Sequence, residues 1–488
     1  MVTTAYFGQM TIEAWEFMLL PIYIFMILAV AWSYTRRKKK LLPQYRYYIP
    51  GLLVKLFGAS IVCCIYVFYY HGGDTVHYWE SGMALTNLFS KNPGHYFETL
   101  FGDNTLDKVF YFDEHTGLPI GFIFYDDQTF SVVRMTAPLL FVTFKSFLLQ
   151  SVMVAWLSYF GIWRLYMVVC HFYPELYKRL ALTILFVPSL VFWGSGLLKD
   201  TITLSATCWL VYAVFQAFFM KKKPVYYFFI MLLASFIIIK IKPYILVTLL
   251  PGILFWISYE RLVTLKSSFL KFFVAPLIFA VALGGGVFML TKMGDSMSKF
   301  SIDKVLVTAA ITQQDLKSES YGSNSFDIGT FDPTVAGVLS KAPFAIEAGL
   351  FRPYIWECSN IVMIFSGLEN VFILGMTLLV LIRFKPIRLL NIIRKNPFIF
   401  FSVLFTLLFS FAVGLTTANF GALVRFKIPF LPFYLSSLVI LSYYLRFRHA
   451  TTQKEIELEK QSMYRRTKPV TPVVPPGMSQ SAGLGAIR

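Results

Sequence analysis

The residues with the clearest chemical potential lie in one short run, HGGDTVHYWE, at positions 71–80. The carboxylate of Asp74 can act as a general base on a hydroxyl group, and its oxygens are also ligands that Mg²⁺ or Mn²⁺ accepts. The preceding pair, Gly72 and Gly73, permits a sharp turn through which a ligand can approach the backbone. The alternative is that this segment only caps a helix beginning near Thr75, because aspartate is a favoured capping residue.

Two aromatic residues, Tyr78 and Trp79, follow Asp74 in the same run. Their rings suit stacking against a sugar, and Tyr78 is the candidate substrate contact. Aromatic side chains are also common where a membrane meets water, which is the alternative interpretation. His71 and His77 flank Asp74, but neither stands at the spacing of a zinc site.

A second group of candidates follows Pro188, in the sequence PSLVFWGSGLLKD that ends at Asp200. We expect a helix that breaks at Gly194 and reopens with Lys199 and Asp200. Helix N-termini attract anions, so Lys199 would add a point charge to a bound phosphate, while Asp200 would pair with this lysine or cap the next helix. The simpler alternative is a capped helical hairpin.

Two arginines and a further lysine complete the set. Arg352 stands in an aromatic cluster with Glu357 nearby, and Arg425 precedes the last apolar segment. A guanidinium forms a forked contact with phosphate or carboxylate, so this group is a candidate for binding a phosphorylated ligand. The alternatives are a buried Arg–Glu pair at Arg352 and an interfacial anchor at Arg425. Lys242 either joins the same site or extends its charge to the membrane surface.

The composition is that of a membrane protein. Of 488 residues, 57% are hydrophobic and 14% are charged, whereas a soluble domain has about a quarter charged residues. Several continuous apolar runs reach the ~20 residues that cross a bilayer as a helix. The formal charge of +18 is concentrated in short loops beside these runs, as the positive-inside bias predicts, so we expect contact with membrane lipids and no nucleic-acid partner.

We expect an all-α, polytopic transmembrane helix bundle of about eleven spans, with the N-terminus outside and the C-terminus inside. The expected spans are residues 15–34, 49–70, 147–169, 180–193, 201–220, 226–241, 244–259, 272–291, 371–382, 397–415 and 428–445. Runs of basic residues at 36–40 and 221–223 follow the first and fifth of these spans, which marks both loops as internal.

Residues 1–450 thus form one transmembrane domain with two large exoplasmic loops, at 71–133 and 292–352. The first loop contains nine Asp or Glu residues and two lysines, which supports its outside position. The segment 451–488 begins with a short charged helix candidate and ends in Pro, Gly and Ser residues, so we expect a disordered cytoplasmic tail.

On this topology, candidate residues from distant parts of the chain reach the outer ends of their spans. Ionisable groups near hydrocarbon are costly and normally have partners. We therefore expect one outward-facing polar cavity lined by the ionisable residues at these ends, which are Asp74, Lys199, Asp200, Lys240, Lys242, Arg352, Glu357, Glu369 and Arg425.

With these residues in view, the chain resembles the GT-C superfamily of polytopic glycosyltransferases. Asp74 matches the acidic residue in the first large outer loop of that family, with Tyr78 in its aromatic context, and the segment NFGALVRFKIP at 419–429 is similar to the late basic motif. The turn SGLLKD at 195–200 resembles one found in bacterial cell-surface polysaccharide membrane proteins, including Wzy-type polymerases. The chain differs in having a span before the acidic loop and in lacking an Asp-x-Asp or Glu-x-Asp pair at Asp74.

The resemblance implies a transferase in the cytoplasmic (inner) membrane that moves a sugar from a polyprenyl-phosphate donor to a glycan or lipid acceptor. It implies Asp74 as the base or as a ligand of Mg²⁺ or Mn²⁺, with Lys199, Arg352 and Arg425 at the donor phosphate. A polymerase or ligase acting on lipid-linked repeats is the first alternative. A transporter is the second, and it is less favoured because the polar residues gather at one face rather than at the membrane midplane.

Overall fold

The computed structural model is helical throughout the part of the chain that it describes. It describes residues 11–264, 284, 325–327, 329, 334–417, 419–447 and 449–467. Extended pairing within these ranges is limited to one antiparallel bridge between Ser325 and Asn419. Three segments lie outside the described residues: the expected span at 272–291 apart from residue 284, most of the expected loop at 292–352 and the tail beyond residue 467.

Seven helical segments in the described ranges are long and apolar enough to cross a membrane. They are α1 (Ala14–Arg36), Pro43–Tyr69 with α3 (Tyr48–Cys64), α8 (Phe147–Phe172), Lys199–Phe219 with α11 (Lys199–Val214), α12 (Pro224–Ile241), α18 (Ile361–Arg383) and α20 (Pro397–Thr416). An eighth segment is a pair bent by 66°, α21 (Phe420–Phe426) and α22 (Leu431–Tyr444). The described part of the chain is therefore helical, and its apolar helices are those of a multi-pass membrane protein.

The expected span at 180–193 is divided into two short helices, α9 (Tyr177–Leu185) and α10 (Pro188–Phe192). Val187 between them has an extended backbone. The ring of Pro188 causes this break, because it disfavours the helical region for the residue before it. The expected span at 244–259 falls in α13 (Pro243–Thr264), whose apolar part is shorter than the seven spans.

Close backbone contact joins α10 to α3 and fixes the turn that precedes α11. A Cβ atom on Gly58 of α3 would lie 2.2 Å from the carbonyl oxygen of Val191 in α10. The buried amine of Lys55 donates to the carbonyl oxygen of Gly194, at the start of that turn. These contacts set the position of the first residue of α11, which is Lys199.

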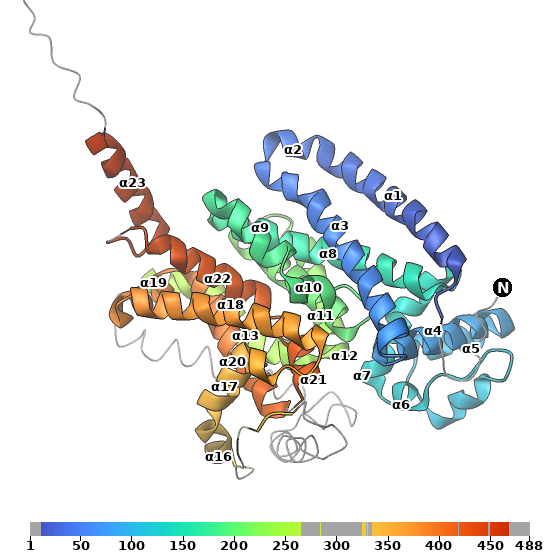
Figure 1. Cartoon of the computed structure of the whole chain (residues 1–488). Helices are drawn as coiled ribbons and strands as arrows, with labels where there is room; N and C mark the ends of the chain where they lie inside the picture. The colour runs from blue at the N-terminus through green and yellow to red at the C-terminus, as the bar shows by residue number, and fades with distance from the viewer. Residues whose placement is uncertain are drawn as a thin grey trace, which may run out of the picture.

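The region 71–133 is folded into helices and is packed beside the end of α3 (Figure 1). These helices are α4 (Asp74–Lys91), α5 (Pro93–Phe101), α6 (Gly121–Phe124) and α7 (Asp127–Thr136). Arg134 of α7 holds them together, since its guanidinium donates to Asp127 at 2.6 Å, to Asn104 at 2.7 Å and to the carbonyl oxygen of Thr99 at 3.2 Å.

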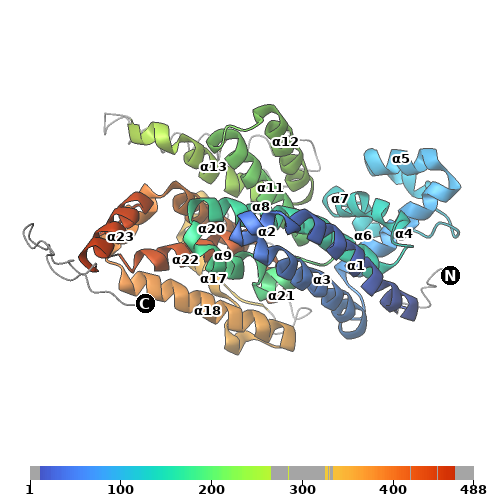
Figure 2. The same cartoon turned by 90° about the horizontal axis from the view of Figure 1, so that it is seen from above.

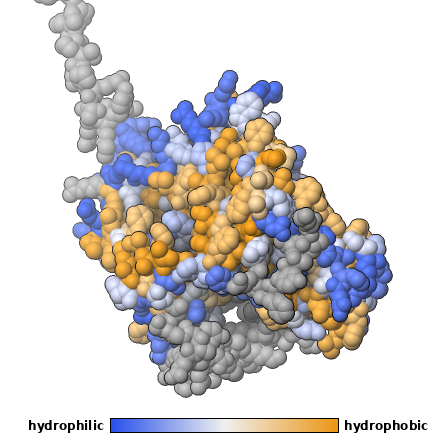
Figure 3. Space-filling model, turned by 45° about the vertical axis from the view of Figure 1, so that its right-hand side comes forward, coloured by the Kyte–Doolittle hydropathy of each residue, from blue (hydrophilic) through white to orange (hydrophobic). Residues whose placement is uncertain are grey.

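The remaining helices pack around a core formed by α8, α11, α13, α20 and α22. Seen from above, α1 and α3 lie side by side, with α12 and α13 on one flank of the molecule and α18 on the other (Figure 2). On the face in Figure 3, hydrophobic side chains cover the middle and hydrophilic ones gather at the upper rim and on the right. The charged start of the tail forms α23 (Gln453–Thr467), as its sequence indicates.

The ends of four apolar segments meet at one place. They are the C-terminal ends of Pro43–Tyr69, α12 and α20, and the N-terminal end of α11. This arrangement gathers polar residues that are widely separated in the sequence.

Candidate functional site

Asp74 is the first residue of α4, and its side chain faces a neighbouring helix rather than its own N-terminus. The residue before it, Gly73, takes the N-cap position with φ = 111°, a conformation that favours glycine. No side-chain cap is formed there; instead Asp74 Oδ2 accepts a hydrogen bond from Arg425 Nη1 at 2.8 Å. The alternative in which this carboxylate caps the helix is therefore not what the structure shows.

Arg425 is held close to the bend between α21 and α22. It lies on α21, whose N-terminus is capped by the side chain of Asn419. Besides Asp74, its guanidinium contacts the hydroxyl of Tyr66 at 3.5 Å, and it lies 5.9 Å from the ring centroid of Trp193. Tyr66 and Trp193 thus fix the direction of the guanidinium. Of these three partners, only Asp74 carries a charge.

The pKa of Asp74 reflects two opposed effects. Burial raises the pKa of this carboxyl, but the charge and the hydrogen bond of Arg425 lower it more, with a smaller contribution from Lys199, so that the pKa falls below its ordinary value. Asp74 is thus ionised, and its ionised form depends mainly on Arg425.

A second ion pair, between Asp200 and Lys242, lies beside the first. Lys242 Nζ is 2.5 Å from Asp200 Oδ1, and both side chains are buried, at 6% and 4% exposure. Asp200 is in the first turn of α11, where the helix dipole favours negative charge. Sequence reasoning left open whether Asp200 pairs with a lysine or caps the helix, and the structure pairs it with Lys242 rather than with the adjacent Lys199.

Lys199 points to α7, at the edge of the region 71–133. Its amine lies 2.5 Å from Thr129 Oγ1 and 3.7 Å from a carboxylate oxygen of Asp126. Lys240 lies close by and pairs with Asp127 at 3.1 Å. Sequence reasoning missed these α7 residues, although the adjacent acids Asp126 and Asp127 were a signal that a pair of lysines would meet them.

One cavity of about 310 Å³ collects most of the candidates. Six of the ten side chains singled out from the sequence line it: Asp74, Tyr78, Lys199, Asp200, Lys242 and Arg425. Tyr78 is one helical turn beyond Asp74 and is buried, and burial together with the Asp74 charge raises the pKa of its hydroxyl well above the ordinary value. The cavity therefore presents paired charges and a neutral phenol.

A second, larger cavity of about 800 Å³ meets the first at the Asp74–Arg425 pair. Four residues line both cavities: Asp74, Thr416, Arg425 and Phe426. The other residues of the second cavity include Tyr66, Tyr70, His71, His77, Trp193, Asn360 and Asn419. Its lining thus combines aromatic and imidazole rings, two amides, three glycines, two threonines and four apolar side chains, and it contains none of the lysines; we call it the aromatic cavity.

Arg352 and Glu357 line neither cavity. Arg352 Nη1 is 3.6 Å from Glu357 Oε1, and Arg352 Nε is 3.7 Å from Glu347 Oε2. Lys427, two residues after Arg425, donates to the carbonyl oxygen of Arg352. The structure thus places Arg352 in the arginine–glutamate contact that was the alternative to phosphate binding, apart from Asp74, Lys199 and Arg425.

The side chains around Asp74 do not form a metal-binding set. Within the described residues, no three His, Cys, Asp or Glu side chains are grouped so that they could hold an ion. The two carboxylates that line the smaller cavity are each paired with a cationic side chain, Arg425 or Lys242. The described residues thus form no cluster that holds Mg²⁺ or Mn²⁺ by protein ligands alone, and the role of Asp74 as a single carboxylate ligand beside a donor phosphate stays a prediction.

Comparison of the chain with protein-family models, with curated proteins and with solved structures gives no match. The functional conclusion therefore depends on the residues themselves and on their geometry.

Proposed function

We propose that the protein is a membrane glycosyltransferase that moves a sugar from a polyprenyl-phosphate donor to a hydroxyl group of a glycan or lipid acceptor, in assembly of a cell-envelope polysaccharide or glycoconjugate. The reaction takes place at the Asp74–Arg425 pair, on the outer face of the cytoplasmic membrane. The cavity with Lys199 and Lys242 takes the donor phosphate, and the aromatic cavity takes the acceptor.

In the transfer, the acceptor oxygen forms a bond to the anomeric carbon of the sugar. The bond between that carbon and the phosphate oxygen breaks, and its electron pair stays on the phosphate. The hydroxyl proton passes to a carboxylate oxygen of Asp74. Lys199 and Arg425 stabilise the negative charge that grows on the departing polyprenyl phosphate.

Because of the ion pair, Asp74 becomes a stronger base only when the donor is bound. A carboxylate with a lowered pKa is a weak base. A donor phosphate competes for the guanidinium of Arg425, because arginine binds phosphate through forked hydrogen bonds. Once Arg425 turns to the phosphate, burial is the main remaining effect on Asp74, so the pKa of the carboxyl rises and its affinity for a proton increases.

The observation that carries the proposal is the meeting of two cavities at one carboxylate–guanidinium pair. Group transfer requires that a donor and an acceptor approach the same base from different directions. The lysines lie on one side of the pair and suit an anionic donor, while the rings of Tyr66, Tyr70 and Trp193 lie on the other and suit a sugar acceptor.

The test is transfer of a radiolabelled sugar from a polyprenyl-phosphate donor by the purified protein in lipid vesicles. We expect Asp74→Asn to lower kcat by about 100-fold or more, the usual loss when a general base is removed. The matched control is Asp113→Asn, an acid of the same region that pairs with Lys91 at the surface. Full activity of Asp74→Asn would remove Asp74 from the mechanism.

A polymerase that joins lipid-linked repeats is the second candidate, and the size of the aromatic cavity favours it. At about 800 Å³ this cavity exceeds the lysine-lined one, so it suits an oligosaccharide better than a single sugar. Chain-length analysis of the cell-surface polysaccharide distinguishes the two functions. Loss of long chains with intact single repeats, on deletion of the protein, indicates the polymerase.

A further inference from the structure

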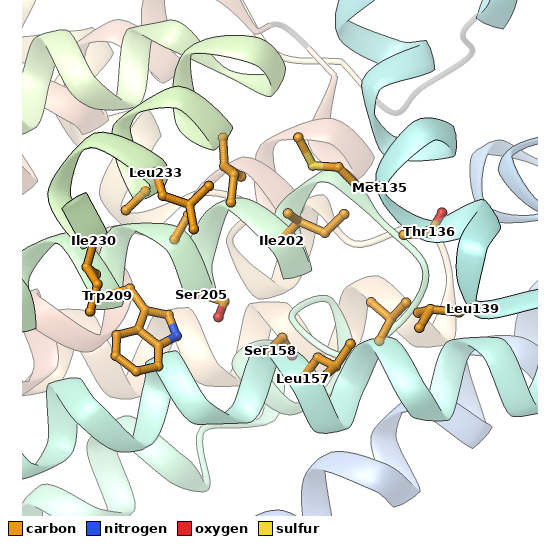
Figure 4. A pocket seen from close by; sticks show the side chains of 14 residues that line it. Met135, Thr136, Leu139, Leu157, Ser158, Ile202, Ser205, Trp209, Ile230 and Leu233 are labelled. Atoms are coloured by element: carbon orange, nitrogen blue, oxygen red, sulfur yellow. The ribbon is translucent and has the colours of Figure 1, made fainter. Parts of the chain in front are cut away.

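An apolar groove of about 410 Å³ lies between α8, α11 and α12, below the end of α7 (Figure 4). Its lining is Met135, Thr136, Leu139, Val154, Leu157, Ser158, Ile202, Ser205, Ala206, Trp209, Ile230, Leu233, Ala234 and Ile237. This lining contains no charged side chain. Its polar groups are the hydroxyls of Thr136, Ser158 and Ser205 and the indole N–H of Trp209. The groove is therefore a site for hydrocarbon.

Small buried residues leave space for the groove, and large exposed residues line its opening. Ser205, Ala206 and Ala234 are buried and leave space between the helices. Leu157 and Leu233 are 45% and 60% exposed, so the groove opens on the outer surface of the helix bundle. Because α12 is an apolar helix with little of its surface buried in the protein, that surface faces lipid.

The groove leads directly to the cationic residues of the candidate site. On α11, Ile202 follows Lys199 by three residues, and on α12, Ile237 precedes Lys240 by three. A helix rises ~1.5 Å per residue, so both lysines lie about 5 Å along their helices from the end of the groove. Two antiparallel helices thus carry a lysine at the same end of the same apolar channel.

The five charged side chains that meet at the polar end of the groove carry a formal net charge of +1. Lys199, Lys240 and Arg134 face Asp126 and Asp127, through contacts of 2.6 to 3.7 Å. A phosphate group is a better partner for such a cluster than a neutral headgroup. The ligand suited to this arrangement has an anionic phosphate at one end and a hydrocarbon chain that continues from it.

We infer that this groove binds the phosphate-proximal isoprenoid units of the polyprenyl-phosphate donor, with the phosphate at Lys199, in the cavity to which the proposed function assigns it. This inference rests on the proposed function. The groove runs along eight residues of α11, from Ile202 to Trp209, a rise of ~10 Å, so only the first units of the chain lie in it and the rest remains in the bilayer. The single channel selects a lipid with one chain over a phospholipid with two.

The first experiment labels the unaltered protein. A polyprenyl phosphate with a diazirine on its second isoprene unit is incorporated with the protein in phosphatidylglycerol-containing nanodiscs, irradiated, and the adducts are mapped by mass spectrometry. We expect adducts on groove residues such as Trp209 and Leu233, and we expect them to be reduced by excess polyprenyl phosphate but not by more phosphatidylglycerol.

Other labelling results overturn the inference in distinguishable ways. Adducts confined to another surface, in a protein that still transfers sugar, reject the groove and leave the proposed function intact. Equal competition by phosphatidylglycerol shows a site for ordinary membrane lipid. Absence of both labelling and transfer rejects the proposed function together with the inference.

A pair of neighbouring leucines provides the matched variants. Leu233→Trp fills the mouth of the groove, whereas Leu232→Trp places the same ring on the same exposed helix outside it. We expect Leu233→Trp to raise KM for a polyprenyl-linked donor about tenfold, equivalent to ~1.4 kcal/mol, with no change for a donor whose chain is replaced by a short alkyl group. Equal effects of the two variants, or an equal effect on both donors, would contradict the inference.

Discussion

Asp74 and Arg425, which are 351 residues apart in the sequence, form an ion pair 2.8 Å long at the junction of two cavities. The contact joins the first turn of α4 to α21, close to its bend with α22. It therefore couples the folded region after the second apolar segment to the end of the bundle, and it sets the protonation of the carboxylate at the centre of the site.

Removing Arg425 should reverse the pH dependence that Asp74 gives to stability. In the unaltered protein the folded-state pKa of Asp74 is below its ordinary 3.8, so the carboxylate stabilises the fold above that pH and the contribution is lost as the pH falls. In Arg425→Gln, burial is opposed only by the weaker charges nearby, so we expect the pKa to rise above 3.8 and stability to increase as the pH falls.

Melting temperatures in detergent between about pH 3 and pH 6 measure this reversal. The effect must disappear in the double variant with Asp74→Asn, because no carboxyl then remains to titrate. Parallel pH profiles for Arg425→Gln and the unaltered protein would show that Arg425 does not control the pKa of Asp74.

The Asp200–Lys242 pair should behave as a buried ion pair. Lys242→Met or Asp200→Asn alone leaves one buried charge without its partner, and we expect each to lower the free energy of unfolding by about 3 kcal/mol. The double variant should recover most of this loss. Thermal unfolding of the four proteins gives the coupling energy, and simple additivity of the two single losses would contradict it.

Gly73→Ala should impair catalysis more than folding. A side chain at φ = 111° is strained, and its Cβ would lie 3.0 Å from the ring of Tyr66, so the first turn of α4 must shift and carry Asp74 with it. We expect a kcat at least tenfold lower with KM for the donor little changed. Gly121→Ala, which has room for a methyl group, is the control; equal kcat values for the two variants would show that the turn does not position Asp74.

The sidedness of the candidate site remains a prediction and can be tested by labelling. In a background without the native cysteines, Leu118→Cys lies in the acidic region and Lys222→Cys in the basic loop between α11 and α12, and both positions are exposed. We expect an impermeant thiol reagent to label position 118 on intact cells and position 222 only after the membrane is opened. The opposite pattern would place the site on the cytoplasmic side.

Much of the bundle could be predicted from hydrophobic length, because a helix needs ~20 apolar residues to cross a bilayer. This reasoning identified seven of the apolar segments, including the one that ends before Asp74. It did not foresee the division of 180–193, although Pro188 was visible, because the apolar pattern continues through the proline. It also treated 71–133 as a loop, whereas the amphipathic helices α5 and α7 have too few apolar residues to register as spans.

Within the site, the sequence indicated which charges reach the ends of helices but not how they pair. Lys199 is adjacent to Asp200, yet it contacts Thr129 while Lys242 takes the aspartate. Neighbouring residues in a helix point in different directions, so adjacency does not imply contact. Arg352 was grouped with Arg425 only because both were expected at the same depth in the membrane. Depth alone does not determine where a residue lies around the helix bundle.

Because the two cavities share a wall, the ligand specificity of one cavity cannot evolve independently of the specificity of the other. Since Asp74, Thr416, Arg425 and Phe426 contribute to both, a substitution at any of these positions alters both chambers at once. Divergence toward new ligands is then expected to proceed first through the unshared positions, such as Gln128 on one side or Asn360 on the other.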